Sequence, residues 1–333
     1  MNTSKRMLKR ILIMAVVIIF LMTTTVARVF YLTIVRGEEL SEKAETQQLK
    51  DTEITAMRGT IYDSNGNVLA QSASVWNVFI DPLNIKDKQR DLIVDEFANL
   101  FGYDADEKKE FYDRTTHQNE LVEKKVENNI KEKLSKFVSK NELGGCIGTE
   151  QTTKRYYTYG TLASSVIGFT GADDQGLSGI EAYYDEQLTG TNGRIITAKD
   201  AKSNNIANDY ETSIAATDGD SIVLTINQTI QYYLEKGLRE TMNEYQAKGA
   251  YGVVMNCNTG AVLAMSSLPD YDCNEPYKLT YSKDKKAIKK LSDKTAKQEA
   301  ESAAVQNQWR NFTVSDTYVP GSVFKTFVAS AAL

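Results

Sequence analysis

The feature that most constrains this chain is an uncharged apolar run close to its amino terminus. Residues 11–27 read ILIMAVVIIFLMTTTVA, and after Arg28 the sequence VFYLTIV continues apolar to Val35. An α-helix rises about 1.5 Å per residue, so roughly 20 residues cross the ~30 Å hydrocarbon core of a bilayer. A helix over residues 11–35 is therefore long enough to span a membrane, provided that the Arg28 side chain extends to the interface.

The residues before this run predict its orientation. They carry four cations and no acid: Lys5, Arg6, Lys9 and Arg10. The positive-inside rule then predicts residues 1–10 as a cytoplasmic tail and everything after residue 35 as extracytoplasmic. The alternative is a signal peptide cleaved near Thr25-Val26-Ala27, but an uncharged run of 17 residues exceeds the usual ~7–15. We therefore expect a single-pass protein anchored in the cell membrane.

Composition restricts the chemistry that such a chain can perform. Its 39 Lys and Arg against 44 Asp and Glu give a net charge of −5, which argues against nucleic acid as a partner. One His, His117, and three Cys, at 146, 257 and 273, leave little for a His-based triad or a zinc site. We expect no metal or cofactor. An odd number of Cys also excludes a full disulfide framework in an exported chain, so unpaired thiols are expected.

Turn residues divide the part after the apolar run into segments. The sequence RGTIYDSNGNVLA at 58–70 holds two β-prone runs around Ser64-Asn65-Gly66, which predicts a hairpin. A polar helix is expected before it, over residues 36–55. Two or three surface helices are expected after it within residues 86–143, where apolar residues recur at helical spacing. Residues 180–188 carry a further helical pattern.

A β-α-β order indicates that a new domain begins near residue 216. The expected elements, in order, are a strand over 218–226, a helix from its N-cap Asn227 to about residue 246, a hairpin over 252–267 and a solvated helical stretch over 283–304.

The candidate chemistry lies in the sequence YVPGSVFK at 318–325. Pro320-Gly321 breaks the chain, and residues 322–333 are then expected to form an apolar helix. Ser322 and Lys325 are three residues apart, so both side chains project from the same face. A serine hydroxyl is a poor nucleophile until a base removes its proton. A neutral lysine amine can act as that base, and burial favours the neutral form of the lysine. The helix start would offer backbone N–H groups to an oxyanion.

This spacing alone is a weak signal. Ser282 and Lys285 repeat it in a hydrophilic stretch, where nothing would desolvate the amine. The alternative reading of the first pair makes Ser322 a helix N-cap and Lys325 a surface cation. From local features the two readings of Ser322 and Lys325 are about equally supported.

The order of motifs along the chain resembles the class B penicillin-binding proteins, which are membrane-anchored peptidoglycan transpeptidases. The motifs that carry the resemblance are RGTIYDSNGNVLA at 58–70, GFTG at 168–171 with GLSGIEAYYDEQLTGTNG at 176–193, LTINQTIQ at 224–231 followed by GAYGVVMNCNTGAVLAMSSLPDYDCN at 249–274, and YVPGSVFK at 318–325. Each is weak alone, but their combination and spacing are specific.

The resemblance implies an α+β chain with four parts. These are a cytoplasmic tail (1–10), a transmembrane anchor (11–35), an elongated mixed pedestal of the dimerisation type (36–215) and the first part of a serine transpeptidase domain with an antiparallel sheet and helices (216–333). It also implies that Ser322 is the nucleophile, acylated by the D-Ala-D-Ala end of a stem peptide, and that Lys325 is the general base. The implied partners are peptidoglycan stem peptides on a lipid-linked precursor or nascent glycan, β-lactams, a polytopic glycan polymerase and division proteins.

The chain departs from the family pattern at several positions. Asn227 and Asn256-Cys257 stand where the family usually has Asp and Asp-Pro, and Cys273 stands where Pro is common; we interpret these as structural drift. The SxN and KTG elements of the family do not occur after Ser322 in this sequence. We therefore expect the 333 residues by themselves to be a truncated, inactive transpeptidase.

Two alternatives belong to other classes. In the first, the anchor and pedestal act as a non-enzymatic scaffold for the cell-wall machinery. In the second, the chain is a penicillin-sensing receptor or a serine β-lactamase, although neither is expected to carry the long pedestal with RGTIYDSNGN. The glycines and Arg58 of the pedestal motifs are expected to set turns and packing rather than chemistry.

Overall fold

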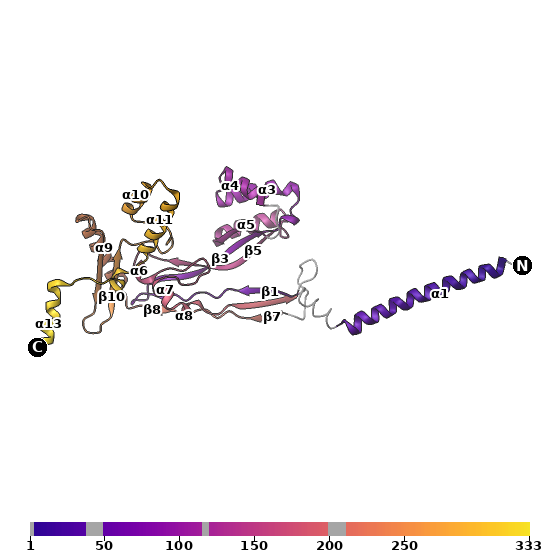
Figure 1. The fold of residues 1–333 in the computed structure, drawn as a ribbon, viewed down its shortest axis with the longest axis horizontal. Helices are drawn as coiled ribbons and strands as arrows, with labels where there is room; N and C mark the ends of the chain where they lie inside the picture. Colours follow the sequence, from indigo (N-terminus) through magenta and orange to yellow (C-terminus); the bar gives the residue numbers. More distant parts are fainter. Residues whose placement is uncertain (1–2, 38–48, 115–119, 199–210) are drawn as a thin grey trace. The chain divides into compact units, whose positions relative to one another are not determined.

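The computed structural model describes residues 3–37, 49–114, 120–198 and 211–333 (Figure 1). The chain divides into two compact units, which are described separately. One comprises residues 1–53 and 193–215, and the other comprises residues 54–192 and 216–333. His117 lies outside the described residues, as do residues 38–48 of the expected polar helix.

The first unit contains the apolar helix. Helix α1 spans Thr3–Phe30 and continues as a π-helical turn over Tyr31–Val35, so the expected helix is confirmed. Leu12–Val35 is long and apolar enough to cross a membrane.

The first unit also holds a small sheet. Strands β1 (Leu49–Ile54), β6 (Gly193–Ala198) and β7 (Glu211–Ile214) form it in the order β1-β6-β7. The expected polar helix is therefore wrong over Leu49–Ile54. This segment pairs with a strand about 140 residues away, and such a partner overrides the local preference.

The main sheet of the second unit is ordered β4-β3-β2-β8, with β5 also paired to β3. Its strands are β2 (Ile61–Tyr62), β3 (Val68–Ile80), β4 (Glu120–Val126), β5 (Ile147–Tyr157) and β8 (Ile222–Val223). The expected hairpin is confirmed by the antiparallel pairing of β2 with β3. Strand β8, much shorter than expected, runs parallel to β2 with Ile222 opposite Ile61.

Three helices lie close to the end of this sheet: α3 (Asp87–Phe101), α4 (Ala105–Arg114) and α5 (Asn128–Lys140) (Figure 1). A 3₁₀ turn over Pro82–Asn84 precedes them. Their apolar faces share one buried cluster that includes Phe97 and Leu134 with Val78 of β3. The expected surface helices are confirmed, although strand β4 lies among them and was not expected.

A second buried cluster joins residues that are far apart in sequence. It includes Ile61, Tyr157, Phe169, Leu188 and Tyr271. Short helices α6 (Ser164–Ile167), α7 (Gly179–Tyr183) and α8 (Asp185–Thr189) surround it. The helix expected over residues 180–188 is interrupted, because Tyr184 leaves helical geometry at φ −108° and ψ 28°.

The remaining part begins with helix α9 (Gln228–Glu244), whose N-cap is Asn227 as expected. The Asn227 side chain accepts hydrogen bonds from the backbone of Thr229 and Ile230. The expected second hairpin is confirmed as β9 (Ala250–Met255) antiparallel to β10 (Val262–Leu268). The other elements are α10 (Ser282–Lys289), α11 (Lys294–Gln308), α12 (Phe312–Ser315), a 3₁₀ turn over Gly321–Phe324 and α13 (Lys325–Ala332).

All three thiols are unpaired, and their environments differ. Cys146 and Cys273 are buried, which raises the pKa of each thiol, whereas Cys257 is exposed beside the β9–β10 turn. Because the thiolate is the reactive form, maleimide should modify one thiol per folded chain and all three in denaturant. Intact mass spectrometry measures this count, and Cys257→Ser should remove the label from the folded protein. Two labels on the folded chain, or a peptide linking Cys257 to Cys273, would contradict the burial described.

Candidate active site

The predicted nucleophile and base lie on a short turn, which we call the acylation turn (residues 320–325). Gly321 adopts φ +56°, a left-handed conformation that glycine adopts without a steric cost. Residues 321–324 then form a 3₁₀ turn, and Lys325 begins α13. The Lys325 N–H donates to the carbonyls of Ser322 and Val323, which closes the turn. Side chains three residues apart in a 3₁₀ turn lie above one another, so Ser322 and Lys325 share one face.

The surroundings of this turn differ from expectation. Lys325 is exposed, and so are its apolar neighbours Phe324, Phe327 and Val328. The expected burial of the Lys325 amine is therefore not found, because the described residues provide no cover for this face of α13. The expected single helix over residues 322–333 also begins as a 3₁₀ turn. The roles of Ser322 and Lys325 stay predictions.

The segment before the turn is attached to the rest of the unit. Asn311 caps α12 by accepting from the backbone of Thr313, and its amide donates to the Ser165 carbonyl at 3.3 Å. The Phe312 ring lies on Tyr251 of β9, with ring centroids 5.2 Å apart. The chain that leads to Ser322 is thus fixed both to the β9–β10 hairpin and to α6.

The second Ser-x-x-Lys pair lies elsewhere. Ser282 begins α10, and Lys285 lies exposed on the same helix. Exposure of the lysine therefore does not separate the two pairs. The distinction lies in the backbone, because only the Ser322 pair follows a Pro-Gly break with a left-handed glycine.

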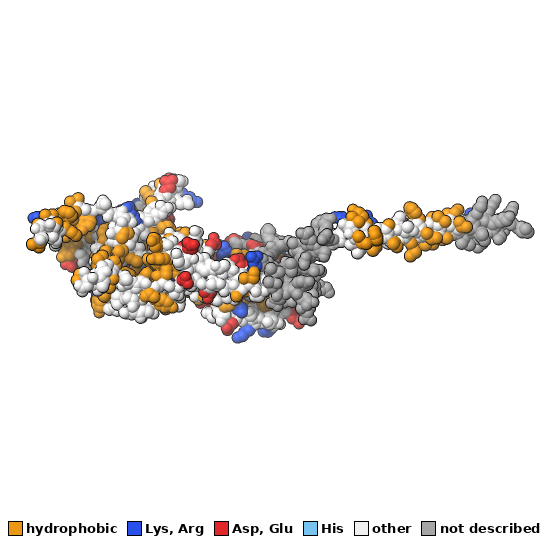
Figure 2. Space-filling model, turned by 90° about the horizontal axis from the view of Figure 1, so that it is seen from below, with side chains coloured by type: hydrophobic (Ala, Val, Ile, Leu, Met, Phe, Trp, Pro, Cys, Tyr) orange, Lys and Arg blue, Asp and Glu red, His pale blue; other side chains and the backbone are white. Residues whose placement is uncertain are grey.

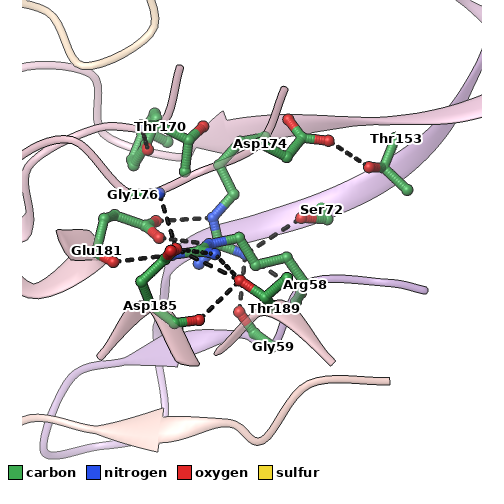
Figure 3. Close-up of polar contacts among 12 residues, drawn as sticks. Arg58, Gly59, Ser72, Thr153, Thr170, Asp174, Gly176, Glu181, Asp185 and Thr189 are labelled. Atoms are coloured by element: carbon green, nitrogen blue, oxygen red, sulfur yellow. Dashed lines mark hydrogen bonds and ion pairs between the residues drawn. The ribbon is translucent and has the colours of Figure 1, made fainter. Parts of the chain in front are cut away.

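A buried ion cluster that the sequence did not reveal lies in the pedestal (Figure 3). It comprises three buried residues, Arg58, Arg155 and Glu181, and the half-buried Asp185. The Glu181 carboxylate accepts from Nε of both arginines, at 2.7 and 2.8 Å, and Arg58 Nη1 donates to Asp185 at 2.7 Å. Arg58 and Glu181 were visible only as parts of two separate motifs, so nothing local indicated that they meet. Two cations and two carboxylates balance, which favours a structural role.

The described residues offer no metal centre, since no three or more His, Cys, Asp or Glu side chains among them are grouped to hold an ion. The chemical groups that the acylation turn brings together are a hydroxyl, an amine and the start of a helix. This set can support acyl transfer through serine.

Comparison with known proteins places this arrangement in a family. The Penicillin-binding Protein dimerisation domain matches residues 53–224, and the Penicillin binding protein transpeptidase domain matches residues 250–333. Stage V sporulation protein D of Bacillus subtilis is 30% identical over 95% of this chain and 44% of its own length. Peptidoglycan D,D-transpeptidase FtsI of Escherichia coli is 25% identical over 92% of this chain and 47% of its own length.

Solved structures agree on the fold. Penicillin Binding Protein 2X from Streptococcus thermophilus matches with a TM-score of 0.51 and 27% identity. The match covers 68% of this chain and 36% of the Streptococcus chain. Penicillin-Binding Protein PBP2 of Helicobacter pylori, solved in a complex with MreC, matches with a TM-score of 0.58 and 23% identity. The match covers 84% of this chain and 51% of the Helicobacter chain.

An apolar amino-terminal helix that is long enough to cross a membrane therefore precedes residues that match a dimerisation domain and a transpeptidase domain, and this combination defines the class of protein. The chain belongs to the class B penicillin-binding proteins, in which a dimerisation domain precedes a transpeptidase domain. The predicted α+β fold and family are thereby confirmed, whereas the predicted boundary between residues 215 and 216 stays a prediction. The chain spans about half the length of the curated relatives that it matches.

Proposed function

We propose that this chain supplies the anchor, the pedestal and the acylating serine of a D,D-transpeptidase that cross-links peptidoglycan. The observation that carries the proposal is the acylation turn, which places Ser322 and Lys325 on one face directly after a left-handed glycine. The turn lies within the residues that match the transpeptidase domain, and relatives of the chain are named peptidoglycan D,D-transpeptidases.

In the proposed reaction, Ser322 Oγ attacks the carbonyl between the two D-Ala residues of a stem peptide. The Lys325 amine acts as the base that takes the hydroxyl proton, and backbone N–H groups of the turn stabilise the oxyanion. The C–N bond breaks, D-Ala leaves with a proton, and a stem ester of Ser322 remains. The amine of a neighbouring stem then attacks the ester and releases Ser322. A β-lactam would be trapped as the ester.

The test is covalent labelling by fluorescent penicillin in a chain continued through the SxN and KTG elements of the family. Ser322→Ala should abolish labelling, and Lys325→Ala should lower its rate by orders of magnitude, since the first removes the nucleophile and the second removes its base. Ser282→Ala is the matched control and should label like the unchanged protein. The 333 residues alone should label weakly, because removing one oxyanion donor already costs ~10² to 10³ in rate.

Two outcomes would contradict this assignment. Labelling that persists with Ala at 322 would place the nucleophile elsewhere. Full-rate labelling of the 333 residues alone would show that the later elements are not needed. A continued chain that never labels, yet still assembles with glycan polymerase or division proteins through its pedestal, would support the non-enzymatic scaffold instead.

We further propose that residues 1–10 lie in the cytoplasm and that the pedestal and the acylation turn lie outside. Four cations before an uncharged run support this orientation. Protease added to intact spheroplasts should therefore digest the chain after about residue 36. Protease added to inverted vesicles should cut only the short tail. A protected pedestal, or a soluble chain released by signal peptidase, would overturn this orientation.

A further inference from the structure

A lysine-rich stretch forms most of helix α10 and the start of α11, and we call it the lysine segment (residues 283–297) (Figure 1). It carries two aspartates and seven exposed lysines, which are Lys283, Lys285, Lys286, Lys289, Lys290, Lys294 and Lys297. The whole chain, in contrast, has a net charge of −5. The segment contains neither Ser322 nor Lys325, so the proposed acyl transfer does not account for it.

Helix stability explains only part of this charge. Asp293 caps α11 by accepting from the Ala296 N–H at 3.0 Å, and Lys289 lies in the last turn of α10, where the helix dipole favours a cation. Lys294 and Lys297 instead begin α11, where the positive end of the dipole opposes a cation. Lysines at these two positions lower the stability of the helix, so helix formation does not account for them.

The lysines of the segment are also free of counter-charges. The lysines that form ion pairs with described residues lie elsewhere, at Lys108, Lys125, Lys236 and Lys278. Within the segment, the Lys283 amine lies 5.9 Å from the centroid of the Tyr281 ring, which does not neutralise it. An ordinary solvated face mixes charges of both signs. These ammonium groups are therefore available to an anionic partner.

The lysines of α10 form one face of the helix. Two neighbouring rows at helical spacing make up this face, Lys283-Lys286-Lys290 and Lys285-Lys289. Ile288 is buried in a cluster with Leu279 and Val305, and this contact holds α10 with its lysine rows toward solvent. The cationic face is therefore continuous and fixed by the packing behind it.

The composition of this face distinguishes between anionic partners. A helix that lies in a membrane interface inserts an apolar face, but Ile288 of α10 is buried. Exposed apolar side chains gather elsewhere, over α1 and at the carboxy-terminal end of the chain (Figure 2). The centre of a protein interface is depleted in lysine and enriched in aromatic residues and arginine. The lysine face therefore fits neither a membrane interface nor a protein interface.

The absence of arginine from the segment narrows the choice further. Recognition of carboxylates favours the planar arginine fork, which binds both oxygens, whereas lysine binds a phosphate as a point charge. Rows of point charges suit a linear polymer of phosphates, because each ammonium group can neutralise one phosphate and release its counterion.

We propose that the lysine segment binds a linear phosphodiester polymer on the extracytoplasmic side of the membrane. The two rows of α10 contact successive phosphates, and Lys294 and Lys297 of α11 extend the contact. Binding of this kind depends on charge spacing and salt rather than on a shaped pocket. The location of the polymer rests on the orientation proposed above, whereas the binding itself depends neither on that orientation nor on Ser322.

The test uses the full 333-residue chain in an uncharged detergent, and the probe is fluorescently labelled poly(glycerol phosphate). Fluorescence anisotropy measures the dissociation constant at a series of salt concentrations. The logarithm of the affinity should fall linearly with the logarithm of the salt concentration, with a slope of about −3 to −5, since each phosphate contacted contributes about −0.7 in a single strand. Replacing Lys286, Lys289 and Lys290 together by Gln should weaken binding at least about tenfold and make the slope shallower by about 2.

The matched control replaces Lys133, Lys136 and Lys140 of α5 together by Gln. These three lysines are also exposed on a helix, and the change in net charge is the same. Glutamine and lysine have similar helix propensities, so both variants should keep the circular dichroism of the unchanged protein. The α5 variant should bind the polymer as the unchanged protein does. Ser322→Ala should also leave binding unchanged, which separates this proposal from acyl transfer.

Four results would overturn the proposal. The first is no binding at the lowest salt concentration. The second is an equal loss of binding in the α10 and α5 variants, which would indicate a response to net charge alone. The third is equal affinity for poly-glutamate, which carries carboxylates in place of phosphates. The fourth is tighter binding to phosphatidylglycerol vesicles than to the polymer, which would assign the lysine segment to a membrane surface.

Discussion

Replacing Glu181 by alanine is expected to lower the free energy of unfolding by about 3–5 kcal/mol, the usual cost of breaking a buried ion pair. Glu181 is fully buried and bonds both Arg58 and Arg155 through Nε. Without it, Arg58 keeps a carboxylate partner in Asp185 at 2.7 Å. Arg155 keeps only neutral acceptors, among them the Gly59 carbonyl at 2.7 Å. The substitution therefore leaves one buried cation without a counter-charge.

Urea unfolding followed by circular dichroism measures this effect, and Glu186→Ala provides the control. Glu186 lies next to Asp185 on α8 but is exposed, so its replacement should change stability by less than about 0.5 kcal/mol. A loss of less than about 1 kcal/mol for Glu181→Ala would show that water reaches the cluster and compensates Arg155.

Gly219→Ala is expected to destabilise the protein by about 3 kcal/mol, at the upper end of overpacking effects. A Cβ atom on Gly219 would lie 1.7 Å from the Leu188 carbonyl oxygen. The clash is with backbone that is fixed on both sides: the Leu188 oxygen accepts from Gly59 N–H at 2.8 Å, and Gly219 N–H donates to Met57 at 2.9 Å. Three chain segments cross here without space for a side chain.

The matched glycine is Gly237, which lies in α9, where a Cβ atom would meet nothing within 4 Å beyond its own helix. Gly237→Ala should raise stability by about 1 kcal/mol, the difference in helix propensity. Thermal or urea unfolding of the two variants should therefore move in opposite directions. Equal, small effects would mean that the crossing at Gly219 is looser than described.

The elements that could be predicted are those whose signals are local. The Asn227 cap, the following apolar spacing of α9 and the turn residues of the β9–β10 hairpin all lie within a few residues of the structure that they form. Strand β1 could not be predicted, because its partner is β6. The interruption of the helix at Tyr184 could not be predicted either, because the helical spacing of apolar residues continues across it.

The candidate site likewise has some features with a local sequence signal and others without one. The spacing of Ser322 and Lys325 and the Pro-Gly break before them are local, and the structure places all four residues on one turn. The exposure of Lys325 depends on which elements cover α13, and that information is not local. The Arg58–Glu181 contact joins residues 123 apart. This contact has no sequence signal of its own.

The parallel pairing of β2 with β8 imposes an order of events on synthesis. Ile61 has its partner at Ile222, and Asp63 accepts from the backbone of Gln228. A nascent chain can form the β2–β3 hairpin early, but β2 keeps an unsatisfied edge until some 160 further residues have emerged. Closing so long a loop is slow, and an open strand edge attracts other chains in the meantime. A delay before residue 222 joins the folding chain would therefore prolong the interval in which this strand edge stays open to other chains.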